Sequence, residues 1–229
     1  MNQELTPQQI DELFAFCRRH YVHYYDVQLE LVDHLANAIE EKMTVDKTIS
    51  FETALDDVHK SFGYKGFAGV VEAKEIALFN KNKQLRWNLF FKYFTVPKIA
   101  LTLFLIGCFM FIGSVVPQNK LNNVSAIIAI AFVVFEIFVA VKSYRIFNKV
   151  SKKLLLISSR YQQNFFSFLA LQFLVQFVKF SDKNDLSFSG YTFFSFLVGL
   201  MIAATLSYYD LCKKLLDISH EQYPQAFVS

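Results

Sequence analysis

The sequence predicts an all-α protein in which a small N-terminal helical bundle is followed by four transmembrane helices. Hydrophobic residues make up 54% of the 229 residues and 27 residues are Phe, a composition too apolar for an ordinary soluble domain. Charge is also divided unevenly. Residues 1–75 hold 14 acidic and 7 basic residues, whereas residues 76–229 hold 6 acidic and 16 basic ones. An acidic N-terminal part followed by a basic, apolar part indicates that the chain occupies two environments.

The composition changes at three places, which we take as domain boundaries. We expect an acidic cytosolic helical domain in residues 1–80, a basic aromatic juxtamembrane linker in 81–95, a transmembrane domain in 96–209 and a cytosolic tail in 210–229. No signal peptide is expected, because the first thirty residues are polar and acidic. The three cysteines are scattered, so the sequence has neither a disulfide framework nor zinc-binding spacing.

The N-terminal domain is expected to contain four helices, because apolar residues recur at helical spacing after several capping signals. On the second expected helix, for example, Leu31, Leu35 and Ile39 fall on one face. The boundaries are read from N-caps at Thr6 (followed by Pro7), Asp26 and Ser50, from a terminating glycine at Gly63, and from a last helix that begins near Phe67.

The segment LELVDHLANAIEEKM, residues 29–43, gathers acidic side chains around one histidine. At 100° per residue, with Leu35 at the centre of the buried stripe, most of the carboxylates fall on the opposite side of the helix. We interpret this side as a solvated acidic face that can serve as a docking surface for a cytosolic partner. The predicted docking face consists of Glu30, Asp33, Asn37, Glu40 and Glu41.

Glu30, Asp33 and His34 are also the best candidates for a metal or acid–base site, since Glu30 and His34 are four residues apart on one helix. A divalent cation would need further ligands from another segment, and only His20 and His23 are obvious. Nothing nearby resembles a nucleophile or an oxyanion hole. The solvated face is therefore the preferred interpretation, and we expect no metal, no cofactor and no enzymatic activity.

Three stretches within residues 10–80 resemble the HAAS-type helical signalling domain: LELVDHLANAIEEKM, then SFETALDDVHKSFG, then GFAGVVEAKEIAL. The resemblance covers a third of the chain and consists mostly of helix patterning. The chain departs from the family in a longer MTVDKTIS loop and in lacking the usual Pro after the Leu-Gly turn. Such domains often precede membrane spans and are associated with PadR-like transcriptional regulators, so the resemblance implies a regulatory membrane protein. The matching positions are Asp33, His34, Leu35, Ala38, Ile39 and Glu40, then Phe51, Glu52, Ala54, Leu55, Phe62 and Gly63.

Four apolar runs are each long enough, or nearly so, to cross the roughly 30 Å hydrocarbon core of a membrane. Lys and Arg are concentrated before the first run, between the second and third, and after the fourth. By the positive-inside rule, both termini are cytosolic, and we expect a multi-pass protein of the bacterial inner membrane. The predicted spans are 96–116, 124–141, 165–180 and 191–208.

Three polar side chains within the predicted spans are candidates for a role there: Glu136 in the second, and Gln172 and Gln176 in the third. A carboxylate in a span is costly and therefore needs a partner or a cavity. We consider a hydrogen bond between Glu136 and a glutamine of the neighbouring helix, snorkelling of Glu136 toward Lys142 or Arg145, and a proton or ion path. The first is preferred.

The linker NKNKQLRWNLFFKYF alternates basic and aromatic residues. Nucleic-acid binding can produce a similar composition, but this stretch stands directly before a span. We therefore expect it to contact anionic lipid rather than nucleic acid. The predicted lipid-interface residues are Arg86, Trp87, Lys92 and Tyr93.

Taken together, these features predict an integral membrane protein with a cytosolic helical interaction domain, regulatory or signalling, which docks a cytosolic partner. The alternative is a small membrane channel or effector in which the N-terminal bundle controls oligomerisation and Glu136 lines a pore. A membrane enzyme is a third interpretation. The expected partners are the lipid bilayer and a cytosolic regulatory protein, and homo-oligomerisation is left open.

Overall fold

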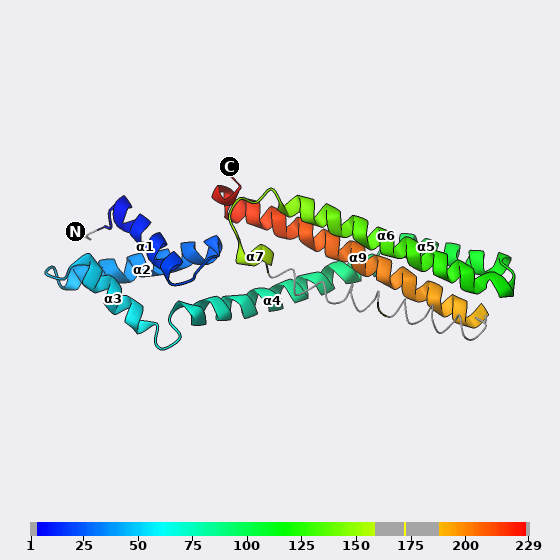
Figure 1. The fold of residues 1–229 in the computed structure, drawn as a ribbon, viewed down its shortest axis with the longest axis horizontal. Helices are drawn as coiled ribbons and strands as arrows, with labels where there is room; N and C mark the ends of the chain where they lie inside the picture. Colours follow the sequence, from blue (N-terminus) through cyan, green and yellow to red (C-terminus); the bar gives the residue numbers. More distant parts are fainter. Residues whose placement is uncertain (1–3, 159–171, 173–187, 228–229) are drawn as a thin grey trace. The chain divides into compact units, whose positions relative to one another are not determined.

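The computed structural model describes residues 4–158, 172 and 188–227, and every regular element in these residues is a helix (Figure 1). The all-α prediction is therefore confirmed for the described part of the chain. The chain divides into two compact units. The first unit comprises Met1–Asn80, Val150–Ser159 and Ser219–Ser229, and the second unit comprises Lys81–Lys149 and Arg160–Ile218.

The first unit is organised around α2. It contains α1 (Pro7–Arg19), α2 (Tyr25–Val45), α3 (Phe51–Ser61) and the beginning of α4 (Phe67–Phe91). It also contains the single-turn helix α7 (Leu155–Ser158) and a short 3₁₀ helix, η4 (Pro224–Ala226). Helices α1, α3 and α7 all pack against α2. Two segments that are remote in sequence, before and after α9, thus belong to the same unit as the N-terminal helices.

Three predicted local signals, at Thr6, Ser50 and Gly63, start or end N-terminal helices. A capping box starts α1: the Thr6 hydroxyl accepts a hydrogen bond from the Gln9 N–H, and the Gln9 side chain accepts one from the Thr6 N–H. Ser50 caps α3 by accepting from the Thr53 N–H. Gly63 follows α3 with a φ of 72°, a left-handed conformation that favours glycine.

The predicted cap at Asp26 is wrong. Helix α2 begins at Tyr25, and the preceding residue, Tyr24, makes no side-chain capping hydrogen bond. Asp26 therefore lies inside the first turn of α2, where it is only 2% exposed. Its carboxylate is used by a different segment of the chain.

The core of the first unit combines the apolar faces of the N-terminal helices with a residue from α7. Leu13, Leu35, Ile39 and Ala54 are fully buried, and Leu155 is fully buried in the same cluster. Burying a leucine side chain contributes roughly 1.5–3 kcal/mol. The segment around α7 is therefore held to the N-terminal helices by apolar packing as well as by polar contacts.

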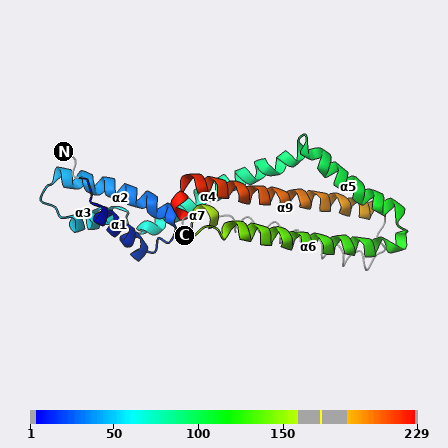
Figure 2. The ribbon, with the colours of Figure 1, turned by 90° about the horizontal axis from the view of Figure 1, so that it is seen from above.

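The second unit contains α5 (Lys98–Val115), α6 (Leu121–Phe147) and most of α9 (Phe188–Gln222), with 3₁₀ turns at η1 (Lys92–Phe94) and η2 (Gln118–Lys120). Figure 2 shows α5, α6 and α9 running alongside one another. In the described residues, three helices are long and apolar enough to cross a membrane, namely Lys98–Val115, Gln118–Phe147 and Ser189–Gln222.

Four spans were predicted, and the structure supports three of them. The predicted spans 96–116, 124–141 and 191–208 fall on α5, α6 and α9. Apart from residue 172, the run 165–180 lies outside the described residues. The α6 and α9 helices extend well beyond their predicted spans, because helical sequence continues into the polar residues on both sides of the apolar runs.

Two glycines allow close packing of α5 against α9. A methyl group at Gly113 would collide with the buried ring of Tyr191, and one at Gly199 would collide with Ile106. Small residues at such positions are typical of membrane helix pairs, where close backbone approach replaces the hydrophobic driving force. The outward faces are apolar and exposed, as at Phe111, which is 69% exposed. Helices buried in lipid expose such surfaces.

Candidate functional site

A buried polar contact in the first unit joins Asp26 of α2 to the first two residues of α7. The Asp26 carboxylate accepts hydrogen bonds from the backbone N–H groups of Leu155, at 2.8 Å, and Leu156, at 3.0 Å. It also accepts one from the N–H of Val27. All of these groups are buried. The carboxylate thus caps α7, and it uses the charge-assisted type of hydrogen bond, which is about twice as strong as a neutral one.

The same region of α2 also holds the C-terminal residues. The Tyr25 hydroxyl donates a hydrogen bond to Gln225 at 2.7 Å, and the Tyr25 N–H donates one to the Lys153 carbonyl at 2.8 Å. The N–H and the hydroxyl of Ser151 both donate to the carbonyl of Ala226 at 2.8 Å. We call this meeting of Tyr25 and Asp26 with residues 151–156 and 223–226 the α2 junction.

Helix α4 contributes one cation to the junction. The Lys74 ammonium forms an ion pair with Glu30 and lies 3.4 Å from the carbonyl oxygen of Asp26. Burial raises the pKa of the Tyr223 phenol; Lys74 acts against this shift, whereas the carboxylates of Asp26 and Glu30 act with it. The C-terminal residues are therefore packed close to three charged side chains of α2 and α4.

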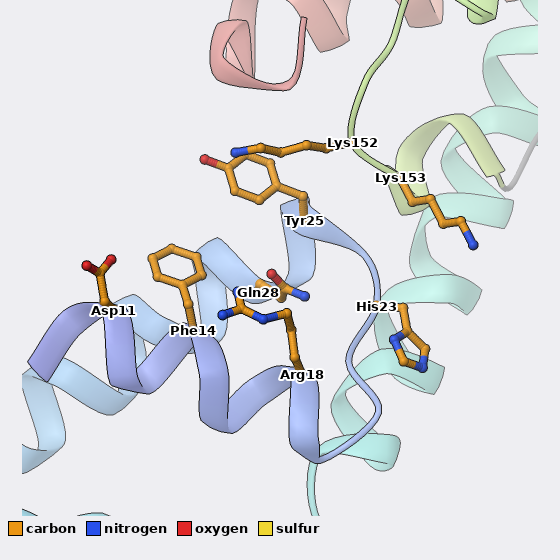
Figure 3. A pocket seen from close by; sticks show the side chains of 8 residues that line it. All are labelled: Asp11, Phe14, Arg18, His23, Tyr25, Gln28, Lys152 and Lys153. Atoms are coloured by element: carbon orange, nitrogen blue, oxygen red, sulfur yellow. The ribbon is translucent and has the colours of Figure 1, made fainter. Parts of the chain in front are cut away.

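A pocket of about 610 Å³ lies beside the junction (Figure 3). Helix α1 supplies Asp11, Phe14 and Arg18, and the following turn and α2 supply His23, Tyr25 and Gln28. The segment after α6 supplies Lys152 and Lys153. The pocket volume falls within the range of small-molecule sites.

Aromatic rings and cations alternate along the pocket wall. The rings of Phe14 and Tyr25 are stacked, with centroids 6.4 Å apart. The Lys152 ammonium lies 3.8 Å from the centroid of the Tyr25 ring, a cation–π contact. Gln28 is buried, and its amide donates a hydrogen bond to the Val22 carbonyl at 2.6 Å. These contacts between lining residues hold the pocket wall in place.

The predicted docking face of α2 is only partly available. Glu30 is paired with Lys74, and the Glu40 carboxylate accepts a hydrogen bond from the Leu5 N–H at 2.9 Å. Asp33, Asn37 and Glu41 are exposed, and no hydrogen bond or ion pair involves their side chains in the described part of the chain. These three residues are spaced four apart, so they form one stripe along α2.

The residues considered for a metal site do not gather in one place. Glu30 turns to Lys74, and His34 is exposed. The His20 ring instead contacts His59, with ring centroids 4.3 Å apart, and His23 lines the pocket. Among the described residues, no group of three or more His, Cys, Asp and Glu could hold a metal ion.

The carboxylate within the predicted spans has a partner that sequence reasoning missed. Glu136 on α6 accepts a hydrogen bond from the hydroxyl of Thr205 on α9. Of the two glutamines predicted to approach it, Gln172 is exposed, and Gln176 lies outside the described residues. The geometry gives Glu136 a helix-to-helix contact of the kind that joins transmembrane helices.

The predicted lipid-interface residues divide into two groups. Trp87 is 43% exposed and Lys92 is exposed, as expected of side chains that face outward. Tyr93 is instead buried, and its hydroxyl donates to Asp210 at 2.9 Å, while Arg86 is half-buried against the Tyr208 ring. Sequence composition marked this linker as amphipathic but could not separate its inner side from its outer side.

No known protein family matches this chain. Comparisons with curated proteins and with solved structures found no similar protein either. The resemblance to HAAS-type domains therefore stays a prediction. The functional argument depends on the geometry of the chain itself, and above all on the α2 junction, which sequence reasoning missed. No signal in the sequence near Asp26 indicated this contact, because the sequence around it is that of an ordinary helix N-cap.

Proposed function

We propose that this chain is a regulatory membrane protein in which a cytosolic helical domain docks a cytosolic partner and is coupled to the membrane helices. The observation that carries the proposal is the α2 junction. There Asp26 and Tyr25 bind the segment that follows α6 and the segment that follows α9. A change in the N-terminal helices would thus act on the segments that follow two candidate membrane helices in the chain.

The composition of the first unit supports a topology with both termini on the cytosolic side. Its three parts are Met1–Asn80, Val150–Ser159 and Ser219–Ser229. Parts that share one core and one hydrogen-bonded junction lie on the same side of a membrane, because unsatisfied polar backbone is not tolerated within lipid. The basic residues around these parts favour the cytosolic side, which in a bacterium means the inner membrane.

If these three parts lie on the same side of the membrane, the chain must cross the membrane an even number of times between one part and the next. Helices α5 and α6 lie between Asn80 and Val150 and would carry the chain out and back. Helix α9 alone would give one crossing between Ser159 and Ser219. The sequence of the apolar run 165–180 suits the second crossing, which supports the four-span interpretation.

The docking surface we propose is the stripe formed by Asp33, Asn37 and Glu41. Its charges are exposed, and the neighbouring carboxylates Glu30 and Glu40 are occupied within the domain. An acidic stripe on a rigid helix favours a partner with a complementary basic surface, since charge complementarity raises both association rate and specificity. The HAAS-like patterning of the same helix supports a regulator as the partner.

The test compares two charge-reversed forms of the full-length chain, cross-linked in native membranes and then affinity-purified. The first carries Asp33→Lys and Glu41→Lys. The matched control carries Glu12→Lys and Asp56→Lys, which reverse two other exposed carboxylates of the same unit. We expect one soluble protein to be recovered with the wild type and the control and to be lost with the first form. Equal recovery with both forms, or none with the wild type, would contradict docking at this stripe.

A further inference from the structure

The pocket beside the α2 junction has the chemistry of an anion site. We propose that it binds a phosphate-bearing anion, held by Arg18 of α1 and Lys152 of the segment after α6. Such a ligand would tie the N-terminal helices to that segment. Binding would require no protein partner, so the inference stands or falls separately from the proposed docking function.

The charge of the pocket is unbalanced. Arg18, Lys152 and Lys153 line it, and Asp11 is the one carboxylate among its lining residues, which leaves a net charge of +2. In the described part of the chain, none of these three cations forms an ion pair. An excess of cations around one pocket is unfavourable because like charges repel, and an anion of charge about −1.5 to −2, as phosphate carries, would reduce that repulsion.

The shape of the donors suits phosphate. The guanidinium of Arg18 offers a planar fork that can bind two phosphate oxygens, and the ammonium of Lys152 acts as a point charge. Figure 3 shows Arg18 extending from α1 toward Gln28, with Lys152 lying along the Tyr25 ring. The two cations thus come from different segments but border the same space.

The rest of the pocket favours an organic phosphate over the bare ion. Its volume of about 610 Å³ is far larger than phosphate needs, and Phe14 and Tyr25 form an aromatic wall for a less polar part. Two sources supply this chemistry: a soluble phosphate compound and the headgroup of an anionic phospholipid. Lys152 is five residues beyond the end of α6, so it lies at most about 18 Å from that helix end.

The experiment measures hydrogen–deuterium exchange of the full-length chain in lipid nanodiscs, at the backbone N–H groups of Tyr25 and Leu155. Both groups are hydrogen-bonded across the junction, so an anion that bridges its two sides should slow their exchange. In one arm, sodium pyrophosphate is added to phosphatidylcholine nanodiscs at constant ionic strength. In the other arm, no pyrophosphate is added and phosphatidylglycerol replaces part of the phosphatidylcholine.

Three variants give the test its specificity. The double variant Arg18→Gln with Lys152→Gln removes the two proposed contacts. The adjacent-charge control, Arg19→Gln with Lys149→Gln, removes the same charge next to Arg18 and three residues before Lys152, at positions that do not line the pocket. Arg18→Lys with Lys152→Arg exchanges the two cations, so it keeps both the net charge and one guanidinium at the pocket. We expect about tenfold or more slowing in the wild type, lost only in the first variant.

Slowing with pyrophosphate would identify a soluble phosphate as the ligand class, and slowing only with phosphatidylglycerol would identify a lipid headgroup. Either result supports the site if the first variant alone abolishes it. No slowing in either arm, or equal slowing in the first variant and the adjacent-charge control, would overturn the proposal.

Discussion

Replacing Asp26 should loosen the segment around α7 without unfolding the N-terminal helices. Asp26→Ala removes the carboxylate that accepts hydrogen bonds from two buried N–H groups, those of Leu155 and Leu156. Asp26→Asn keeps the size of the side chain but leaves one acceptor oxygen and turns an amide NH₂ toward the other N–H. The alanine variant should therefore have the larger effect.

The magnitude follows from the two hydrogen bonds. A hydrogen bond to a charged group contributes about 1.5–3 kcal/mol, and an orphaned buried donor costs about 1–3 kcal/mol. Since these effects overlap, we expect Asp26→Ala to cost about 3–5 kcal/mol and Asp26→Asn about 2 kcal/mol. A loss of about 3 kcal/mol corresponds to roughly hundredfold faster opening, because about 1.4 kcal/mol is a factor of ten.

Hydrogen–deuterium exchange at Leu155 and Leu156 measures this opening directly. The matched control is Asp33→Ala, which makes the same chemical change at an exposed position of the same helix. We expect exchange at both leucines to accelerate in Asp26→Ala and to stay unchanged in the control. Unchanged exchange in Asp26→Ala would refute the inference that this carboxylate holds the segment.

Three further predictions concern packing, pH and thiol reactivity. Gly113→Ala should lower the melting temperature in detergent because its methyl group meets a buried tyrosine ring, whereas Gly107→Ala on the same helix, with open space around it, should not. In the folded protein, burial and, to a smaller extent, the neighbouring His20 lower the pKa of His59 below its ordinary value of 6.5. His59 therefore binds a proton more readily in the unfolded chain than in the folded one. The free energy of unfolding should thus fall as pH drops below about 6.5 and level off below the folded-state pKa; in His59→Asn this pH dependence should be weaker in thermal melts. Burial raises the pKa of the Cys17 thiol to about 11, so iodoacetamide at pH 8 should modify it only after denaturation, as peptide mass spectrometry would detect.

The parts of the fold that could be predicted from sequence depend on local signals. The capping box at Thr6, the cap at Ser50 and the glycine at Gly63 each act within a few residues, so their effect can be read from neighbours. The three candidate spans are likewise set by continuous apolar runs. In all of these cases, the residues that decide the structure are adjacent in the chain.

The junction could not be predicted, because its contacts join positions far apart. Asp26 and Leu155 are separated by 129 residues, and Tyr25 and Gln225 by 200. An Asp shortly before an apolar run is a normal capping signal, and nothing in its neighbourhood indicates that it caps another helix instead. For the same reason, the sequence shows Lys152 as one of several cations in a loop and gives no sign that it lines a pocket.

The segment 150–157 is therefore where the functional arguments converge. Lys152 and Lys153 of this segment are among the residues that line the pocket, and the N–H groups of Leu155 and Leu156 donate to Asp26. An anion bound by Lys152 and Arg18 would pull on the same short segment that Asp26 holds, only three residues away. Occupancy of the pocket and stability of the junction should then be thermodynamically linked, so that Asp26→Ala weakens pyrophosphate binding although Asp26 does not line the pocket. If binding is the same in Asp26→Ala and the wild type, pocket and junction are independent, and the segment serves only as a structural tie.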